Sequence, residues 1–183
     1  RYGLVGSEMC IRDRNKTNKE NWKDYISHRQ DVLLEDIDLF NNHLVVTERK
    51  TGLRRIEIRP WKGGDSHYIE FEDEAYSLYS STNLETNTNK FRYSYSSMTT
   101  PNSVIEYDMN SKEKIILKET EVLGGKFDKN NYVSLRVWAP ARDGKKIPIS
   151  LVYRKDMYKN GENPLLLYGL SLIHISEPTR PYL

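Results

Sequence analysis

A short sequence pattern recurs along this chain, and the spacing of its copies limits what the chain can fold into. Residues 56–58 (IEI) correspond to residues 105–107 (IEY) at an offset of 49, and residues 68–69 correspond to residues 115–116 at an offset of 47. Each copy belongs to a group of four short apolar runs separated by turn residues. Groups of four short strands that recur roughly every 40–50 residues are typical of β-propeller blades. The sequence therefore predicts two successive blades.

The strands of these blades are predicted from alternation and from turn residues. Thr51 and Gly52 separate residues 43–50 from residues 53–60, and a two-residue loop with glycine is typical of a β-hairpin. Residues 91–98 (FRYSYSSM) alternate aromatic and polar side chains, the period of a half-buried strand. Because two blades cannot close a ring, we expect other blades upstream. The remaining predicted strands are residues 32–34, 67–71, 75–79, 104–109 and 114–118.

The pattern changes after residue 122. Gly124 and Gly125 interrupt the chain, and residues 132–140 and 147–153 then alternate as two strands joined by a turn. Residues 164–169 (PLLLYG) form a continuous apolar run, which is typical of a strand covered on both faces, as inside an α/β sheet. This order favours the opening strands of an α/β-hydrolase domain.

The two ends of the chain are related through the DNA that would encode them. Residues 4–14 (LVGSEMCIRDR) can be written in codons whose reverse complement translates as LSLIHISEPTR, the sequence of residues 170–180. Unrelated protein segments have no physical reason to be antisense to each other, whereas one oligonucleotide ligated at both ends of an insert gives this result. The string resembles the transposon-end adapter of sequencing libraries. We therefore exclude Cys10 and His174 from the search for functional residues.

The expected fold is mostly β, and the chain between the two adapters is expected to be an internal fragment of a longer protein. Its four expected parts are translated adapter over residues 1–14, the last two propeller blades over 15–123, the start of an α/β-hydrolase domain over 124–169, and translated adapter over 170–183.

Composition argues against several classes of partner. The net charge is +2, too small for a large electrostatic footprint on nucleic acid. No stretch approaches the roughly 20 apolar residues of a membrane span, and no secretory leader opens the chain. The only cysteine lies in the expected adapter, which excludes a disulfide framework and a thiolate zinc cluster. We expect neither nucleic acid nor membrane as a partner. Nothing in the composition defines a compartment, and a cytoplasmic location is favoured.

Candidate catalytic residues are few. No G-x-S-x-G, the strained turn that exposes the nucleophilic serine of α/β-hydrolases, occurs in the sequence. Ser66 lies near two glycines but lacks the rest of the motif, so we interpret it as a turn residue. His28, His43 and His67 show neither metal-ligand spacing nor a nearby cysteine, and positions in solvent or in hairpins are favoured over ligation.

The charged and aromatic clusters are interpreted in the same way. Acidic residues at 36, 38, 70 and 72–74 lack the spacing and the glycine of a calcium loop, and solvated loop charge is favoured over a metal site. The basic residues between 49 and 59 alternate with Glu48 and Glu57, and we interpret them as a solvated hairpin face. Tyr93 and Tyr95 lie at strand spacing, which favours packing inside a blade over a ligand surface.

A family resemblance rests on several segments that occur in order. They are residues 32–36 (VLLED), HLVVTER from 43, YSSMTTP at 95–101, LKETEV at 117–122, ARDG followed by IPISLVY, and NPLLLYG at 163–169. Together they resemble oligopeptidase B, a branch of the prolyl oligopeptidase family of serine peptidases. YSSMTTP favours this branch over its proline-specific relatives.

The resemblance implies a propeller that covers an α/β-hydrolase domain and restricts access to it. It also implies cleavage of short basic peptides after Lys or Arg, with no metal or organic cofactor. Family members continue after NPLLLYG with a second Tyr-Gly whose tyrosine helps to bind the oxyanion, but here position 170 is Leu. Only Tyr168 and Gly169 can be carried over, as the edge of the oxyanion region.

The resemblance places the Ser-His-Asp triad beyond residue 169, so no catalytic residue is assigned within the chain, and we expect the chain itself to be inactive. A non-catalytic propeller-type binding module is the alternative. The blade repeat favours that alternative, but PLLLYG has no place in a blade.

Overall fold

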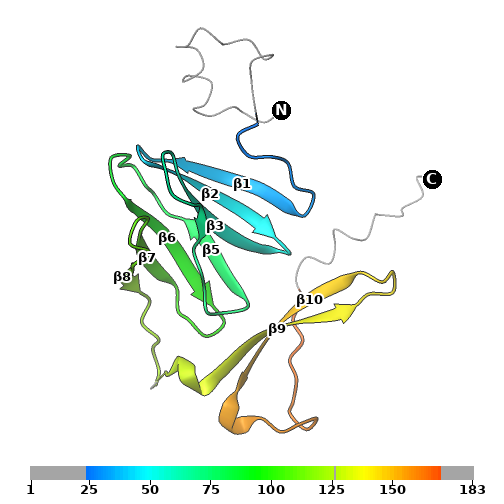
Figure 1. Cartoon of the computed structure of the whole chain (residues 1–183). Coiled ribbons are helices and arrows are strands. Elements are labelled where there is room, and N and C mark those ends of the chain that lie inside the picture. Colours follow the sequence, from blue (N-terminus) through cyan, green and yellow to red (C-terminus); the bar gives the residue numbers. More distant parts are fainter. Residues whose placement is uncertain (1–23, 126, 170–183) are drawn as a thin grey trace, which may run out of the picture.

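The computed structural model describes residues 24–125 and 127–169, and the regular structure in these ranges is almost entirely β. It comprises two four-stranded sheets and one two-stranded sheet. The larger sheets lie against each other, and the two-stranded sheet extends beyond one end of the pair (Figure 1). The prediction of a mostly β fold is confirmed. The expected adapter segments lie outside the described residues, so their origin stays a prediction.

The first sheet consists of β1 (Val32–Leu39), β2 (His43–Lys50), β3 (Leu53–Pro60) and β4 (His67–Tyr68), paired antiparallel in that order. Between β2 and β3, Thr51 and Gly52 have φ values of 49° and 84°. Two consecutive left-handed residues are typical of the type I′ turn, whose twist matches the two strands of a hairpin. The predicted hairpin is confirmed, although β1 is longer and β4 shorter than expected.

The second sheet repeats the first. Its strands are β5 (Tyr76–Ser80), β6 (Lys90–Ser97), β7 (Ser103–Asp108) and β8 (Lys114–Glu119), again antiparallel and in chain order. Glu57 pairs with Tyr68 in the first sheet, and Glu106 pairs with Ile115 in the second. These positions are equivalent at the offsets found in the sequence, so strand register confirms the internal repeat. We call β1–β4 the first blade and β5–β8 the second blade.

One hydrophobic core holds the two blades together. Ile56 and Ile58 of the first blade and Phe91 and Tyr93 of the second are fully buried in a single cluster. Phe40 meets Phe91 edge to face, with ring centroids 6.3 Å apart, an arrangement that aromatic quadrupoles favour. Burial of each such side chain contributes about 1.5–3 kcal/mol. Tyr93 and Tyr95 are thus packing residues, as predicted.

The hairpin of the first blade carries a buried ion network, which corrects the interpretation of its charges as solvated. Glu48 is 0% exposed, and its carboxylate accepts hydrogen bonds from Arg29, Arg55 and Tyr68. Glu35 similarly binds Arg49 and Arg54. The alternation of signs is therefore a pattern of pairing between strands, because a carboxylate removed from water requires cationic or hydroxyl partners.

The two-stranded sheet is a long hairpin of β9 (Tyr132–Pro140) and β10 (Lys146–Arg154). Short 3₁₀ turns, η2 (Lys129–Asn131) and η3 (Lys155–Met157), flank it. The break predicted between blades and hairpin coincides with positive φ values at Gly124 and Gly125, 91° and 157°. The two predicted strands are confirmed.

The predicted strand over residues 164–169 is absent. This segment has no regular structure, and Leu165, Leu166 and Leu167 are 76%, 90% and 80% exposed. An apolar run forms a buried strand only when neighbouring strands and covering helices are present. Among the described residues none pairs with it, so an α/β sheet does not form there. The described ranges also contain no helix with the length and hydrophobicity needed to cross a bilayer.

Candidate functional site

The β9–β10 hairpin contacts the two blades at the end of their strands where the β2–β3 turn lies. The Arg136 side chain, from β9, donates a hydrogen bond through Nη2 to the carbonyl oxygen of Thr51 at 2.5 Å. The backbone N–H of Arg136 donates to Oε2 of Glu74, in the loop between the blades, at 2.8 Å. These two contacts place β9 against the β2–β3 turn and the β4–β5 loop, and we call this region the junction.

Gly52 serves two purposes at the junction. Its φ of +84° fits the type I′ turn, and a Cβ built on it would lie 3.0 Å from Nη2 of Arg136. A larger residue would therefore strain the turn and push the guanidinium away from the carbonyl of Thr51.

Beside the junction, Asp73 ties the loop between the blades to the β6–β7 turn. Its carboxylate accepts hydrogen bonds from the hydroxyls of Tyr95 at 2.6 Å, Thr99 at 3.1 Å and Thr100 at 3.2 Å. Burial alone would raise the pKa of Asp73, but the hydrogen bonds from Tyr95, the two threonines and Ser97 lower it below its ordinary value. Asp73 is thus a half-buried anion with a structural role, which corrects its interpretation as solvated loop charge.

A groove of about 540 Å³ lies between the second blade and the segment that leads to the hairpin. Phe71 and Tyr95 stack within it, with ring centroids 5.1 Å apart, and Phe127 lines its far side. Lys114 lies 5.2 Å from the Phe71 ring centroid and donates to the carbonyl of Glu70. Burial lowers the pKa of Lys114. The groove combines aromatic surface with two lysines, Lys114 and Lys129, and several carboxylates.

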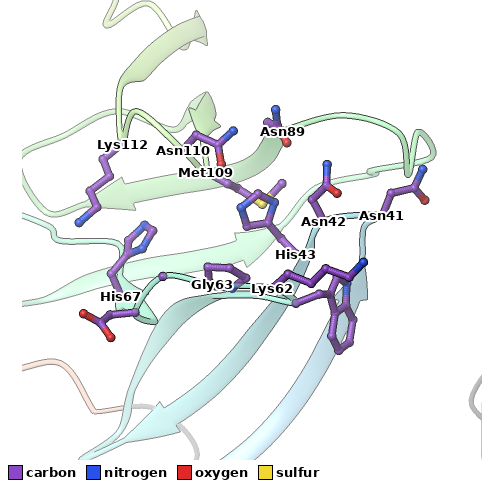
Figure 2. A pocket seen from close by; sticks show the side chains of 14 residues that line it. Asn41, Asn42, His43, Lys62, Gly63, His67, Asn89, Met109, Asn110 and Lys112 are labelled. Atoms are coloured by element: carbon purple, nitrogen blue, oxygen red, sulfur yellow. The ribbon is translucent and has the colours of Figure 1, made fainter.

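A second cavity, of about 670 Å³, lies at the end of the blade strands opposite the junction (Figure 2). We call it the histidine pocket. His43 is buried at the start of β2, and His67 is half-buried in β4. Nε2 of His67 is 2.8 Å from the hydroxyl of Tyr107. The sequence pattern favoured separate positions for these histidines, in solvent or in hairpins. In the structure both line one pocket. His28 lies exposed, outside it.

The other candidates do not assemble into a site. Ser66 is an exposed loop residue. Asp38 accepts a hydrogen bond from Ser80 at 2.9 Å, a contact between the blades. Over residues 24–125 and 127–169, no group of three or more His, Cys, Asp or Glu side chains could hold a metal ion.

Tyr168 and Gly169 end the described chain as exposed residues without regular structure. No catalytic role can be derived from this placement, so their assignment to the edge of an oxyanion region stays a prediction.

Comparison with protein families and known proteins shows which proteins this chain is similar to. Residues 5–120 match the model of the N-terminal β-propeller domain of prolyl oligopeptidases. The chain is 44% identical over 168 residues to dipeptidyl aminopeptidase BI of Pseudoxanthomonas mexicana, covering 91% of this chain and 23% of that protein.

Two solved structures are similar in fold and sequence. Oligopeptidase B from Leishmania major superposes with a TM-score of 0.63 and 34% identity, and oligopeptidase B from Trypanosoma brucei with a TM-score of 0.61 and 30% identity. Each comparison covers 73% of this chain and 20% of the other. The chain thus spans about a fifth of the length of the relatives it matches.

Proposed function

This chain belongs to the prolyl oligopeptidase family, and we propose that it is part of a serine peptidase that cleaves short peptides after Lys or Arg. Residues up to 123 would form the last two blades of its propeller, and residues 124–169 would begin its α/β-hydrolase domain. The carrying observation is the likeness, at 34% identity, to a solved oligopeptidase B over 73% of the chain. We extend the proposal to a cytoplasmic location.

The junction supports this division of the chain. The β9–β10 hairpin shares no sheet with the blades, and the two hydrogen bonds that join it to them go to Thr51 in a turn and Glu74 in a loop. Such contacts are typical of a boundary between domains, where few interactions cross. In this role the hairpin would carry the chain from the propeller into the catalytic domain.

The proposed chemistry is nucleophilic acyl transfer. A serine hydroxyl activated by histidine attacks the peptide carbonyl, and hydrogen-bond donors stabilise the resulting oxyanion. Tyr168 and Gly169 would lie at the edge of the oxyanion region. The 183 residues contain no G-x-S-x-G, so we expect no hydrolysis by this chain alone.

A direct test compares this chain with a longer product of the same gene. The gene is read beyond codon 169, and the protein that includes any downstream G-x-S-x-G is purified. The long form should release chromophore from an N-terminally blocked arginyl substrate, with inhibition by a serine-directed covalent reagent, while the 183-residue chain should not. Absence of the motif from the downstream gene would instead favour the non-catalytic binding module. Inhibitor-sensitive release by the short chain would overturn the proposed inactivity.

A second candidate activity is removal of dipeptides from a free amino terminus. It is favoured by the 44% identity to a protein named dipeptidyl aminopeptidase BI. The long form distinguishes the two activities if it is given matched arginyl substrates with free and with blocked amino termini. Preference for the free dipeptide would favour the aminopeptidase, and efficient cleavage of the blocked substrate would favour the endopeptidase.

A further inference from the structure

The histidine pocket lies at the end of the blades that faces away from the junction. It is lined by the β1–β2 turn, the β3–β4 loop and the β7–β8 turn, so residues of both blades contribute to it. Strand β2 begins with His43 at the pocket and ends with Lys50, next to the junction turn. At about 3.3 Å per residue, the two ends of β2 are roughly 23 Å apart.

His43 is the least solvated polar group of the pocket. Its side chain projects among Met109, Asn110 and the Gly63 loop in Figure 2, and it is only 4% exposed. Its Nδ1 atom is buried and has no hydrogen-bond partner among the described residues. A buried polar atom without a partner costs about 1–3 kcal/mol. Because this atom is closed to solvent, a ligand in the pocket would contact the imidazole through its other edge.

The pocket carries more positive than negative side chains. Lys62 and Lys112 line it together with the two imidazoles, whereas Asp65 is the only carboxylate among its lining residues. Lys112 has a left-handed backbone, with φ of 65°, a conformation uncommon for residues other than glycine. Four asparagines add amide donors around the rim: Asn41, Asn42, Asn89 and Asn110.

These features select an anion over a metal ion. Nitrogen donors from imidazole, ammonium and amide groups can all bind carboxylate or phosphate oxygens, and the volume lies within the range of ligand sites, about 300–1,000 Å³. Metal binding is disfavoured because the described residues provide no cluster of three ligands.

We propose that the histidine pocket binds a small molecule that carries a carboxylate or phosphate group, with His43 and Lys112 as hydrogen-bond donors to its oxygens. His43 donates from the ring nitrogen that faces the pocket when that nitrogen carries the proton. The asparagine side chains and Lys62 surround the rest of the bound molecule. This site requires both blades, and it does not depend on the peptidase activity proposed above.

Binding should strengthen as the pH falls. Burial lowers the pKa of His43, and a side-chain hydrogen bond with Asn110 and the negative charge of Asp108 offset this only in part. Burial, together with the positive charges of Lys112 and His43, also lowers the pKa of His67. Both imidazoles are therefore mostly neutral above the ordinary value of 6.5. An anion favours their protonated forms, so its affinity rises below that value.

The experiment uses NMR signals of the imidazole carbons of the 183-residue chain. Inorganic phosphate and citrate are titrated separately, with sodium chloride at matched ionic strength as the control for screening. We expect saturable shifts of His43 and His67 with at least one of the two oxyanions, and no saturable shift of His28. The arm that saturates identifies the phosphate or the carboxylate as the recognised group. Equal shifts in chloride, or no saturation with either oxyanion, would overturn the proposal.

Matched variants test the assignment of the donors. Lys112→Gln should reduce the affinity for the saturating anion about tenfold, as expected for loss of one charge-assisted hydrogen bond. Lys145→Gln removes an exposed lysine on the β9–β10 loop, and should leave the affinity unchanged. His43→Gln should also weaken binding and reduce its pH dependence to the part that His67 contributes. If all three variants bind equally, the proposed site is wrong even where the wild-type chain binds the anion.

Discussion

The blades and the β9–β10 hairpin are built from the same antiparallel pairing, yet their side chains have different surroundings. Each blade packs one face against the other blade, and Phe91 and Ile56 are excluded from water. In the hairpin, Val137, Trp138 and Ile147 remain exposed although their strands pair over nine positions. Hydrogen-bonded strands alone therefore do not exclude water, and a second sheet is required to form a core.

The largest expected effect follows from truncating the core between the blades. Phe91→Ala removes a fully buried ring and leaves a cavity between the sheets, which should lower the free energy of unfolding by about 3–5 kcal/mol. Urea denaturation measures this change. Leu166→Ala, at a 90% exposed position of the tail, should change it very little. Similar losses in both variants would contradict the contrast between the two regions.

Glu48 tests the polar part of the same region. Glu48→Gln leaves Arg29 and Arg55 without their shared anion, and should lower the free energy of unfolding by about 2 kcal/mol. This is less than for a fully buried pair because both arginines are about one-third exposed. Glu70→Gln, at an exposed position, is the matched control and should be close to neutral.

The Glu48 network also predicts a pH dependence. Burial alone would raise the pKa of Glu48, but hydrogen bonds from Arg55, Tyr68 and Arg29 hold it below the ordinary value of 4.5. A depressed carboxylate pKa contributes stability above the unfolded value and loses it as the pH falls through the folded value. Acid unfolding below pH 4.5 should therefore be shallower for Glu48→Gln than for the unmodified chain. Identical acid profiles would count against a charged Glu48.

Asp73 should have an intermediate effect, because it joins loops around the core. Asp73→Asn weakens acceptance from Tyr95 and the two threonines, and should cost about 1–2 kcal/mol. Thermal unfolding measures the loss. Glu72→Gln, one position earlier and 95% exposed at its side chain, serves as control, and a loss as large as that of Asp73→Asn would show that local charge rather than the hydrogen bonds is responsible.

The smallest global effect is expected at the junction. Arg136→Gln removes the hydrogen bond to Thr51, and should change the free energy of unfolding by less than about 1 kcal/mol. Hydrogen exchange of β9 amides should nevertheless become faster, because local opening requires only that the hairpin separate from the blades. Arg142→Gln on the exposed hairpin loop should leave exchange unchanged. A large global loss would mean that hairpin and blades unfold as one unit.

The sequence predicted the strands well because their patterns are local. Period-2 alternation located β6, and the glycine of the β2–β3 turn located the first hairpin. The sequence repeat also relates the two blades without any knowledge of their contacts. The strand predicted at residues 164–169 was wrong. An apolar run of this kind forms a strand only between neighbouring strands and helices, and the described part of this chain does not supply them.

The sites were harder to predict because their residues are far apart in sequence. Asp73 and its partners are separated by 22 to 27 positions, and no local pattern connects them. A signal for the histidines did exist. His43 and His67 begin β2 and β4, and alternate strands of an antiparallel sheet start at the same edge.

The contacts of Asp73 show that the second blade depends on a residue that precedes its first strand. Asp73 precedes β5, but its hydroxyl donors come from β6 and from the turn that follows it. An exchange of blades between homologues that cut the chain just before Tyr76 would separate this carboxylate from the turn it braces. A chimera that keeps residues 73–101 from a single parent would transfer the brace intact.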